Sequence, residues 1–260
     1  MRRARRKLPA VRSFDDTTLW RISAFDRMRD ETGTSGFAKL AGATVLPSTL
    51  LADLSRFDEP AHARDVLEVM AACMRNLSPA LIYLGHEELV WPVTVFPTQM
   101  LYHSPRDMTQ ASRGGLADLR FIDVEPPGVR APGHWMHERV ASAEQYRSLS
   151  DLLWLMALHG PRGTLLAEIG GVAAYRAVKD IESEGQLVTG AMGSAAIRLR
   201  RETVALRDIA GWPGMSVERA SRLVNALYLT GGLLVTRTHP AARADPGAAR
   251  RAFGLGKPGR

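Results

Sequence analysis

The chain has 260 residues, of which 45% are hydrophobic and 23% are charged, and its formal net charge at pH 7 is +7. This composition is typical of a globular protein with one large or two ordinary domains, and it excludes a disordered chain. No apolar run approaches the roughly 20 residues that cross a bilayer. The single cysteine, Cys73, excludes a disulfide framework. We therefore expect a cytoplasmic protein without a membrane span.

The positive charge is concentrated at the two ends of the chain. Residues 1–12 carry +6 and residues 241–260 carry +4, so residues 13–240 together carry −3. Basic arms of this kind bind nucleic-acid phosphates or an anionic membrane surface, or serve only as solubilising tails. We expect a basic arm over residues 1–13 and a flexible basic tail over residues 241–260.

The pattern between residues 14 and 130 predicts an α+β module that senses a signal or forms oligomers. Apolar residues at helical spacing indicate a helix over Thr17–Arg29 and another from Asp58, its expected cap, to about Asn76. The second helix would bury Cys73 as a structural thiol. The hydrophobic period then changes to two and predicts consecutive antiparallel strands over residues 80–84, 89–96 and 99–103, and a fourth strand over residues 119–125. Pro92 has no N–H for a central ladder, so its strand is expected at an edge or a bulge.

A turn-rich segment, residues 126–133, is the expected internal boundary, and residues 141–240 are expected to form a helical module. Helices are predicted over Ser148–His159, Val172–Glu184, Glu202–Ile209 and Ser216–Thr230, with β-prone runs at residues 187–189 and 233–236. The pattern Gly-x-Leu-Val-Thr at residues 185–189 recurs at residues 232–236. This repeat favours two helix–strand units in tandem.

The segment Ser216–Arg237 has the clearest functional implication. It combines an amphipathic helix, a Gly-Gly stop and a β-prone run, and it resembles the recognition helix and wing of winged-helix regulators. The helix face opposite the apolar stripe carries Glu218, Arg219, Ser221, Arg222 and Asn225. Arginine and asparagine bond to guanine and adenine edges in a major groove. The candidate DNA contacts are therefore Arg219, Arg222, Asn225 and, in the wing, Arg237.

Catalytic and cofactor motifs are absent from the sequence: it contains no phosphate loop, nucleophile elbow or dinucleotide fingerprint. His134 and His137, three residues apart beside Glu138, could share a metal on a helix, but no third ligand is assigned. His86 and His103 follow predicted strand ends and could converge. We expect a protein that is not an enzyme and has no cofactor or metal.

Together these patterns predict an α+β protein with an N-terminal sheet module and one or two winged-helix-like units. The leading hypothesis is a cytoplasmic regulator that binds DNA through its C-terminal unit. The alternative is a signalling adaptor or scaffold that binds proteins and never contacts nucleic acid. A metal-dependent enzyme using His134 and His137 is a third hypothesis. Homo-oligomerisation is compatible with the first two.

Overall fold

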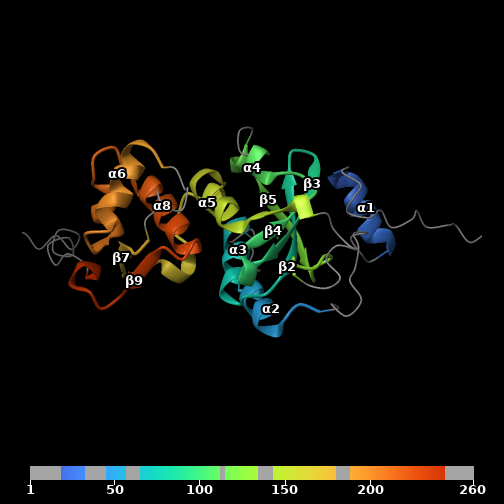
Figure 1. Ribbon diagram of the computed structural model, residues 1–260, viewed down its shortest axis with the longest axis horizontal. Helices are drawn as coiled ribbons and strands as arrows, with labels where there is room; N and C mark the ends of the chain where they lie inside the picture. Colours follow the sequence, from blue (N-terminus) through green and yellow to red (C-terminus); the bar gives the residue numbers. More distant parts are fainter. Residues whose placement is uncertain are drawn as a thin grey trace, which may run out of the picture. The chain divides into compact units, whose positions relative to one another are not determined.

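The computed structural model describes residues 19–32, 45–56, 65–111, 115–133, 143–179 and 188–243. The chain divides into two compact units, residues 1–161 and 162–260, and each combines helices with an antiparallel sheet (Figure 1). The predicted α+β class is confirmed. The unit boundary lies later than the predicted connector, because strand and helix elements up to His159 belong to the first unit. The basic arm and most of the basic tail lie outside the described residues.

The first unit is built on a six-stranded antiparallel sheet. Its strand order is β5-β2-β3-β4-β6, and β1 also pairs with β3. The four strands predicted from the period of two are confirmed, whereas β1 and β6 were not predicted. The strands are β1 (Trp20–Arg21), β2 (Ala80–His86), β3 (Leu89–Phe96), β4 (Leu101–His103), β5 (Arg120–Glu125) and β6 (Tyr146–Ser148).

Pro92 lies in an internal strand, and the expectation of an edge strand is wrong for β3 as a whole. The tight turn between His86 and Leu89 sets a register in which the Pro92 nitrogen points away from β2. On that side β1 pairs with residues 89–90 and β4 with residues 94–96. Among the described residues, Pro92 therefore faces the gap between β1 and β4, where its missing N–H breaks no ladder bond.

Helices cover the sheet of the first unit. Figure 1 shows α3 and α5 on one side of the strands and α1 on the other. The described part of the helix expected from Asp58 begins only at Val66, and its cap is Asp65, whose carboxylate accepts the Leu67 N–H at 2.7 Å. The predicted helix ending at His159 is confirmed. The helices are α1 (Ile22–Thr32), α2 (Ser48–Ser55), α3 (Val66–Arg75), α4 (Met108–Ala111) and α5 (Leu149–His159).

Core residues of the first unit pack on both faces of its sheet. Phe25 of α1 packs on Tyr83 with ring centroids 5.0 Å apart, and both side chains are fully buried. Cys73 of α3 is also fully buried, as expected for a structural thiol. Four aromatic residues of β2, β3 and β4 are almost completely buried and belong to the core of the unit: Tyr83, Trp91, Phe96 and Tyr102.

The second unit has a three-stranded antiparallel sheet in the order β8-β7-β9. The central strand β7 comes first in the chain. The predicted helices over residues 202–209 and 216–230 correspond to α7 and α8, and the strand after them is confirmed as β9; α6 was not predicted. The elements are β7 (Ala174–Ala177), α6 (Gly190–Leu199), β8 (Val204–Ala205), α7 (Leu206–Ala210), α8 (Val217–Leu229) and β9 (Leu233–Thr236).

The predicted helix over Val172–Glu184 is wrong, because Ala174–Ala177 forms strand β7. Its apolar residues at helical spacing are equally compatible with a short strand that follows a Gly-Gly pair. The tandem repeat fails for the same reason. In addition, Val188 and Thr189 are not in a strand but precede α6. Finally, β9 forms no hairpin with a later described strand and pairs instead with β7.

Candidate nucleic-acid interface

Helices α7 and α8 form a helix-turn-helix joined by residues 211–216. Gly214 in the turn has φ +73°, and a Cβ there would lie 2.8 Å from the Cβ of Ala191 in α6. Only glycine fits this conformation and this close approach. Ser216 then caps α8, because its Oγ accepts the Arg219 N–H at 3.2 Å. The turn and the cap thus fix where α8 begins.

Only the first turn of α8 is well exposed. Val217, Glu218 and Arg219 are exposed, whereas most later positions of the helix are buried. Arg219 donates one N–H to the Gly214 carbonyl at 2.6 Å. Its other guanidinium donors have no partner among the described residues, so Arg219 is able to bind an anion.

Arg222 is engaged within its own helix. Its Nε donates to Glu218 Oε1 at 2.9 Å, an i,i+4 pair on the helix surface. The Arg222 side chain is only 16% exposed, compared with 62% for Glu218. Arg222 therefore neutralises and positions Glu218 rather than standing free in solvent.

Asn225 is fully buried, so its predicted place on an exposed face is wrong. Its Nδ2 donates to the Thr164 carbonyl at 2.9 Å, and its Oδ1 accepts the Leu166 N–H at 3.0 Å. Ser221 is 1% exposed and donates its hydroxyl to the Val217 carbonyl. The part of the polar face that holds Asn225 is thus covered by the chain that enters the second unit, while Glu218 and Arg219 stay exposed. Helical periodicity alone cannot predict that a distant segment of the chain buries one side of a helix.

Arg237 follows β9 and holds the same entering chain. Its Nη1 and Nη2 donate to the carbonyls of Gly170 and Glu168, both at 3.0 Å. Burial raises the pKa of the neighbouring Tyr175, and the Arg237 charge partly opposes this shift. Arg237 therefore links the end of the sheet to the segment before β7, and in the described part of the chain no hairpin after β9 presents it.

The charge is divided between the two units. Without the terminal arms, residues 13–161 contain 13 Lys and Arg against 19 Asp and Glu, and residues 162–240 contain 10 against 7. The first stretch is thus −6 and the second +3, and residues 241–260 raise the net charge of the whole second unit to +7. Counting residues 13–240 as one body conceals this separation, and the correct boundary reveals it. The second unit has the charge of a phosphate-binding domain.

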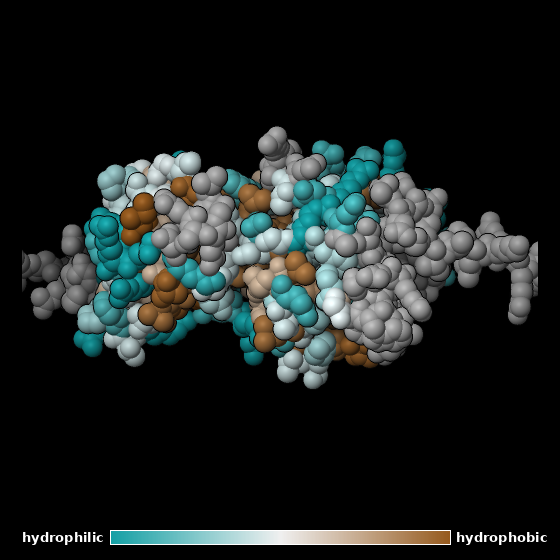
Figure 2. Space-filling view, in the orientation of Figure 1, coloured by the Kyte–Doolittle hydropathy of each residue, from teal (hydrophilic) through white to brown (hydrophobic). Residues whose placement is uncertain are grey.

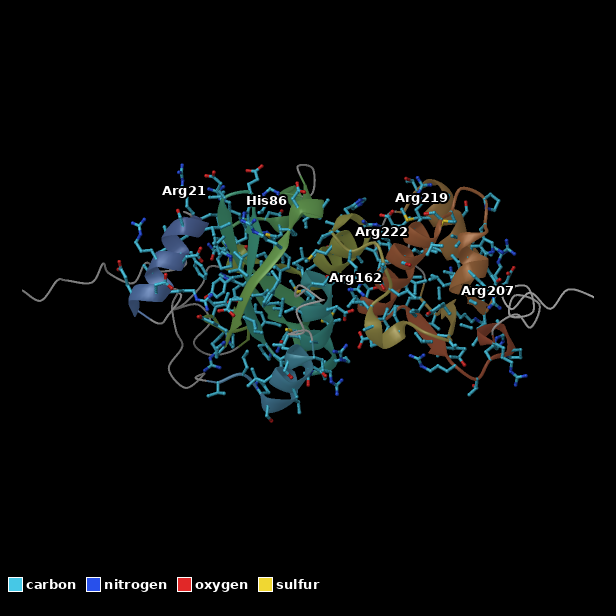
Figure 3. The ribbon with its side chains drawn as sticks, turned by 180° about the vertical axis from the view of Figure 1, so that it is seen from behind. Arg21, His86, Arg162, Arg207, Arg219 and Arg222 are labelled. Carbon is cyan, nitrogen blue, oxygen red and sulfur yellow. The ribbon has the colours of Figure 1, made fainter. Side chains whose placement is uncertain are left out.

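Further arginines of the second unit lie on α6 and α7. The Arg207 side chain is 50% exposed and donates to the Arg243 carbonyl at 2.9 Å. The guanidinium of Arg198 lies 4.5 Å from the ring centroid of Trp212 and pairs with Glu202 at 3.2 Å. In Figure 3, Arg219 and Arg207 lie well apart on the unit. A ligand that contacts both must be extended.

The two described histidines of the first sheet, His86 and His103, do not converge on one site. His86 pairs with Leu89 and His103 with Thr94, five residues further along β3, which separates them by about 17 Å and places them on opposite faces. His103 is buried, and its Nε2 lies 2.9 Å from Gln145 Oε1. The described residues contain no group of three metal-ligating side chains. His134 and His137 lie outside them.

Comparison with known proteins gives no relative: no family model, curated protein or solved structure matches the chain. Within the described part of the chain, no helix has the length and apolar character needed to cross a bilayer. The geometry and charge of the second unit are thus the basis for assigning a function.

Proposed function

We propose that the protein is a DNA-binding regulator whose second unit contacts duplex DNA through the α7–α8 helix-turn-helix. The observation that carries this proposal is the exposed first turn of α8, with Arg219, in a unit of net charge +7. In helix-turn-helix proteins the start of the second helix reaches base edges while the first helix crosses the backbone. Arg219 would take the first role and Arg207 the second.

The contact would be made by the beginning of α8 and not along its length. The face that holds Asn225 is covered by Thr164 and Leu166, so it cannot enter a groove. Glu218, which would repel phosphate, is paired with Arg222. Asn225, Arg222 and Arg237 are thus engaged in bonds within the second unit, and direct contact is left to Arg219 and Arg207.

The topology is compatible with a modified winged helix. In a winged helix, a β-hairpin follows the second helix of the helix-turn-helix. Strands β9 and β7 would form that hairpin if β7 came after β9 in the chain. Here β7 comes from before α6. Residues 13–161 of the first unit, with a net charge of −6, are suited to sensing or oligomerisation rather than to phosphate binding.

Fluorescence anisotropy with a labelled duplex tests this proposal on the full chain. Arg219→Ala is expected to weaken binding about tenfold and to reduce the salt slope by about 1. Arg176→Ala is the matched control, because Arg176 is an exposed arginine on the sheet of the same unit. Equal losses for the two variants would show that only net charge matters and would contradict a helix-turn-helix contact.

A second variant distinguishes DNA binding by the folded second unit from DNA binding by the basic ends of the chain. Deleting residues 1–12 and 244–260 removes most of the terminal positive charge. Binding that disappears completely would exclude the helix-turn-helix as a reader. The alternative, a protein-binding adaptor, is favoured by the burial of Asn225 and Ser221, and absence of DNA binding even at low salt would support it.

A further inference from the structure

Strand β9 has a free edge. It pairs on one side with β7, and no described strand pairs with its other side. The opposite border of this sheet is different, because η6 (Pro240–Ala242) packs beside β8. The exposed edge of the sheet is therefore β9.

The register of β9 identifies which backbone groups lie at that edge. The Val178 N–H donates to the Gly232 carbonyl at 2.9 Å, and Leu234 is the partner of Arg176. Because ladder bonds alternate in an antiparallel pair, Leu234 bonds to β7 while Leu233 and Val235 point their N–H and C=O groups away from it. No hydrogen bond within the described chain satisfies these outward groups.

The edge lacks the features that normally prevent strand pairing. The strand sequence Leu-Leu-Val-Thr contains no charge and no proline. The Leu234 side chain is 51% exposed, and Val178 on the same sheet face is 58% exposed. Figure 2 shows an apolar patch over β9 among hydrophilic atoms. An apolar, unprotected edge of this kind is suited to β-strand addition.

We propose that β9 is the interface of a homodimer, in which β9 of a second copy pairs with it antiparallel about a two-fold axis at Leu234. This register makes the edge self-complementary. Leu233 and Val235 of each copy exchange hydrogen bonds with Val235 and Leu233 of the other, giving four bonds. The two Leu234 residues then form a non-hydrogen-bonded pair, with Cα atoms about 4.5 Å apart and side chains in contact. The two sheets become one of six strands.

Electrostatic repulsion does not prevent this pairing, although the second unit is basic. The charge nearest the axis on this face is Arg176, on the strand next to β9. Three strand spacings, about 14 Å, separate Arg176 from its copy. This exceeds the screening length of about 8 Å at physiological ionic strength.

Sedimentation velocity of the full chain without DNA measures the dimer directly and independently of the proposed function. We expect a reversible dimer whose dissociation constant rises at least about tenfold in Leu234→Lys, because two like charges would meet on the axis. Val178→Lys adds the same charge to the same face but to the neighbouring chain segment, and is expected to leave dimerisation nearly unchanged. Circular dichroism confirms that both variants remain folded.

Cysteine cross-linking tests the register. Leu234→Cys places two thiols at a Cα separation compatible with a disulfide, so mild oxidation should give a covalent dimer. The only native cysteine, Cys73, is buried and does not interfere. Val178→Cys should remain uncross-linked. A chain that stays monomeric at all concentrations, a dimer indifferent to Leu234→Lys, or cross-linking at Val178→Cys alone would overturn the proposal.

Discussion

The side chain of Asn225 in α8 accepts a hydrogen bond from the backbone N–H of Leu166 and is completely buried. The same amide donates to the Thr164 carbonyl, so one side chain satisfies two backbone groups of an incoming segment. An amide can do this because it carries a donor and an acceptor. The residue that looks most suited to reading adenine is instead an internal link of the second unit.

Asn225→Ala should therefore destabilise the protein. It leaves the Leu166 N–H and the Thr164 carbonyl without their partner, which we expect to lower the free energy of unfolding by about 2 kcal/mol in urea titrations. Asn225→Asp keeps the acceptor and loses the donor, so its effect should differ from that of alanine. DNA affinity of the folded alanine variant should equal that of wild type. An alanine variant that is as stable as wild type but binds DNA more weakly would instead indicate that Asn225 contacts DNA.

The turn before α8 should tolerate no side chain at Gly214. Gly214→Ala combines a left-handed conformation with a Cβ 2.8 Å from Ala191, and we expect a loss of about 2 kcal/mol in thermal or urea unfolding. Gly211→Ala is the matched control in the same turn. Gly211 has φ −81°, and a Cβ there would meet nothing closer than 3.5 Å. That variant should be neutral or slightly stabilised, and equal losses at the two positions would be inconsistent with this geometry.

The thiol of Cys73 should be inert in the folded protein. Burial raises its pKa to about 12, while the charge of Arg75 slightly opposes the shift. We expect no alkylation of the native protein by iodoacetamide at mildly alkaline pH and modification of one thiol per chain after unfolding in urea, as measured by mass spectrometry. Rapid alkylation under native conditions would contradict the burial of the Cys73 thiol in α3.

Asp53 should make the first unit acid-sensitive. It accepts hydrogen bonds from Asn76 at 2.9 Å and Arg75 at 3.2 Å, which join α2 to α3. Burial alone would raise the pKa of Asp53, but the Asn76 hydrogen bond and the Arg75 charge hold it below its usual value of 3.8. The lowered pKa means that the stabilisation is present above pH 3.8 and is lost as the pH falls through the folded value.

Asp53→Asn should accordingly reduce the free energy of unfolding by about 1 kcal/mol near neutral pH. The difference from wild type should shrink as the pH falls below about 4, where the wild-type carboxylate becomes protonated. Urea titrations at several pH values measure both quantities. A difference that grows on acidification would have the wrong sign for this interaction.

Local sequence patterns predicted the elements that the local sequence determines. Strands β2, β3 and β5 are rich in β-branched and aromatic residues and are flanked by turn residues, and α8 has both a cap and a long apolar stripe. By contrast, β7 is four residues long and rich in alanine, and its strand conformation depends on a partner near the other end of the unit. Long-range pairing of this kind has no local period.

The candidate site illustrates the same limit. The exposed position of Arg219 follows from its place in the first turn of α8, so it could be predicted. The burial of Asn225 depends on Leu166, which lies 59 residues earlier. The pairing of Arg222 with Glu218 could have been anticipated from their i,i+4 spacing. The opposite net charges of residues 13–161 and 162–240 needed only the correct boundary.

The central position of β7 has a consequence for synthesis. This strand leaves the ribosome before both of its neighbours, and its partner β9 follows only after β8, α7 and α8. In the nascent second unit, the β9 side of Ala174–Ala177 therefore stays unpaired until Leu233–Thr236 has been made, when this late pairing completes the sheet. A ribosome stalled before Leu233 would leave that side of β7 open and make the unfinished chain a substrate for chaperones.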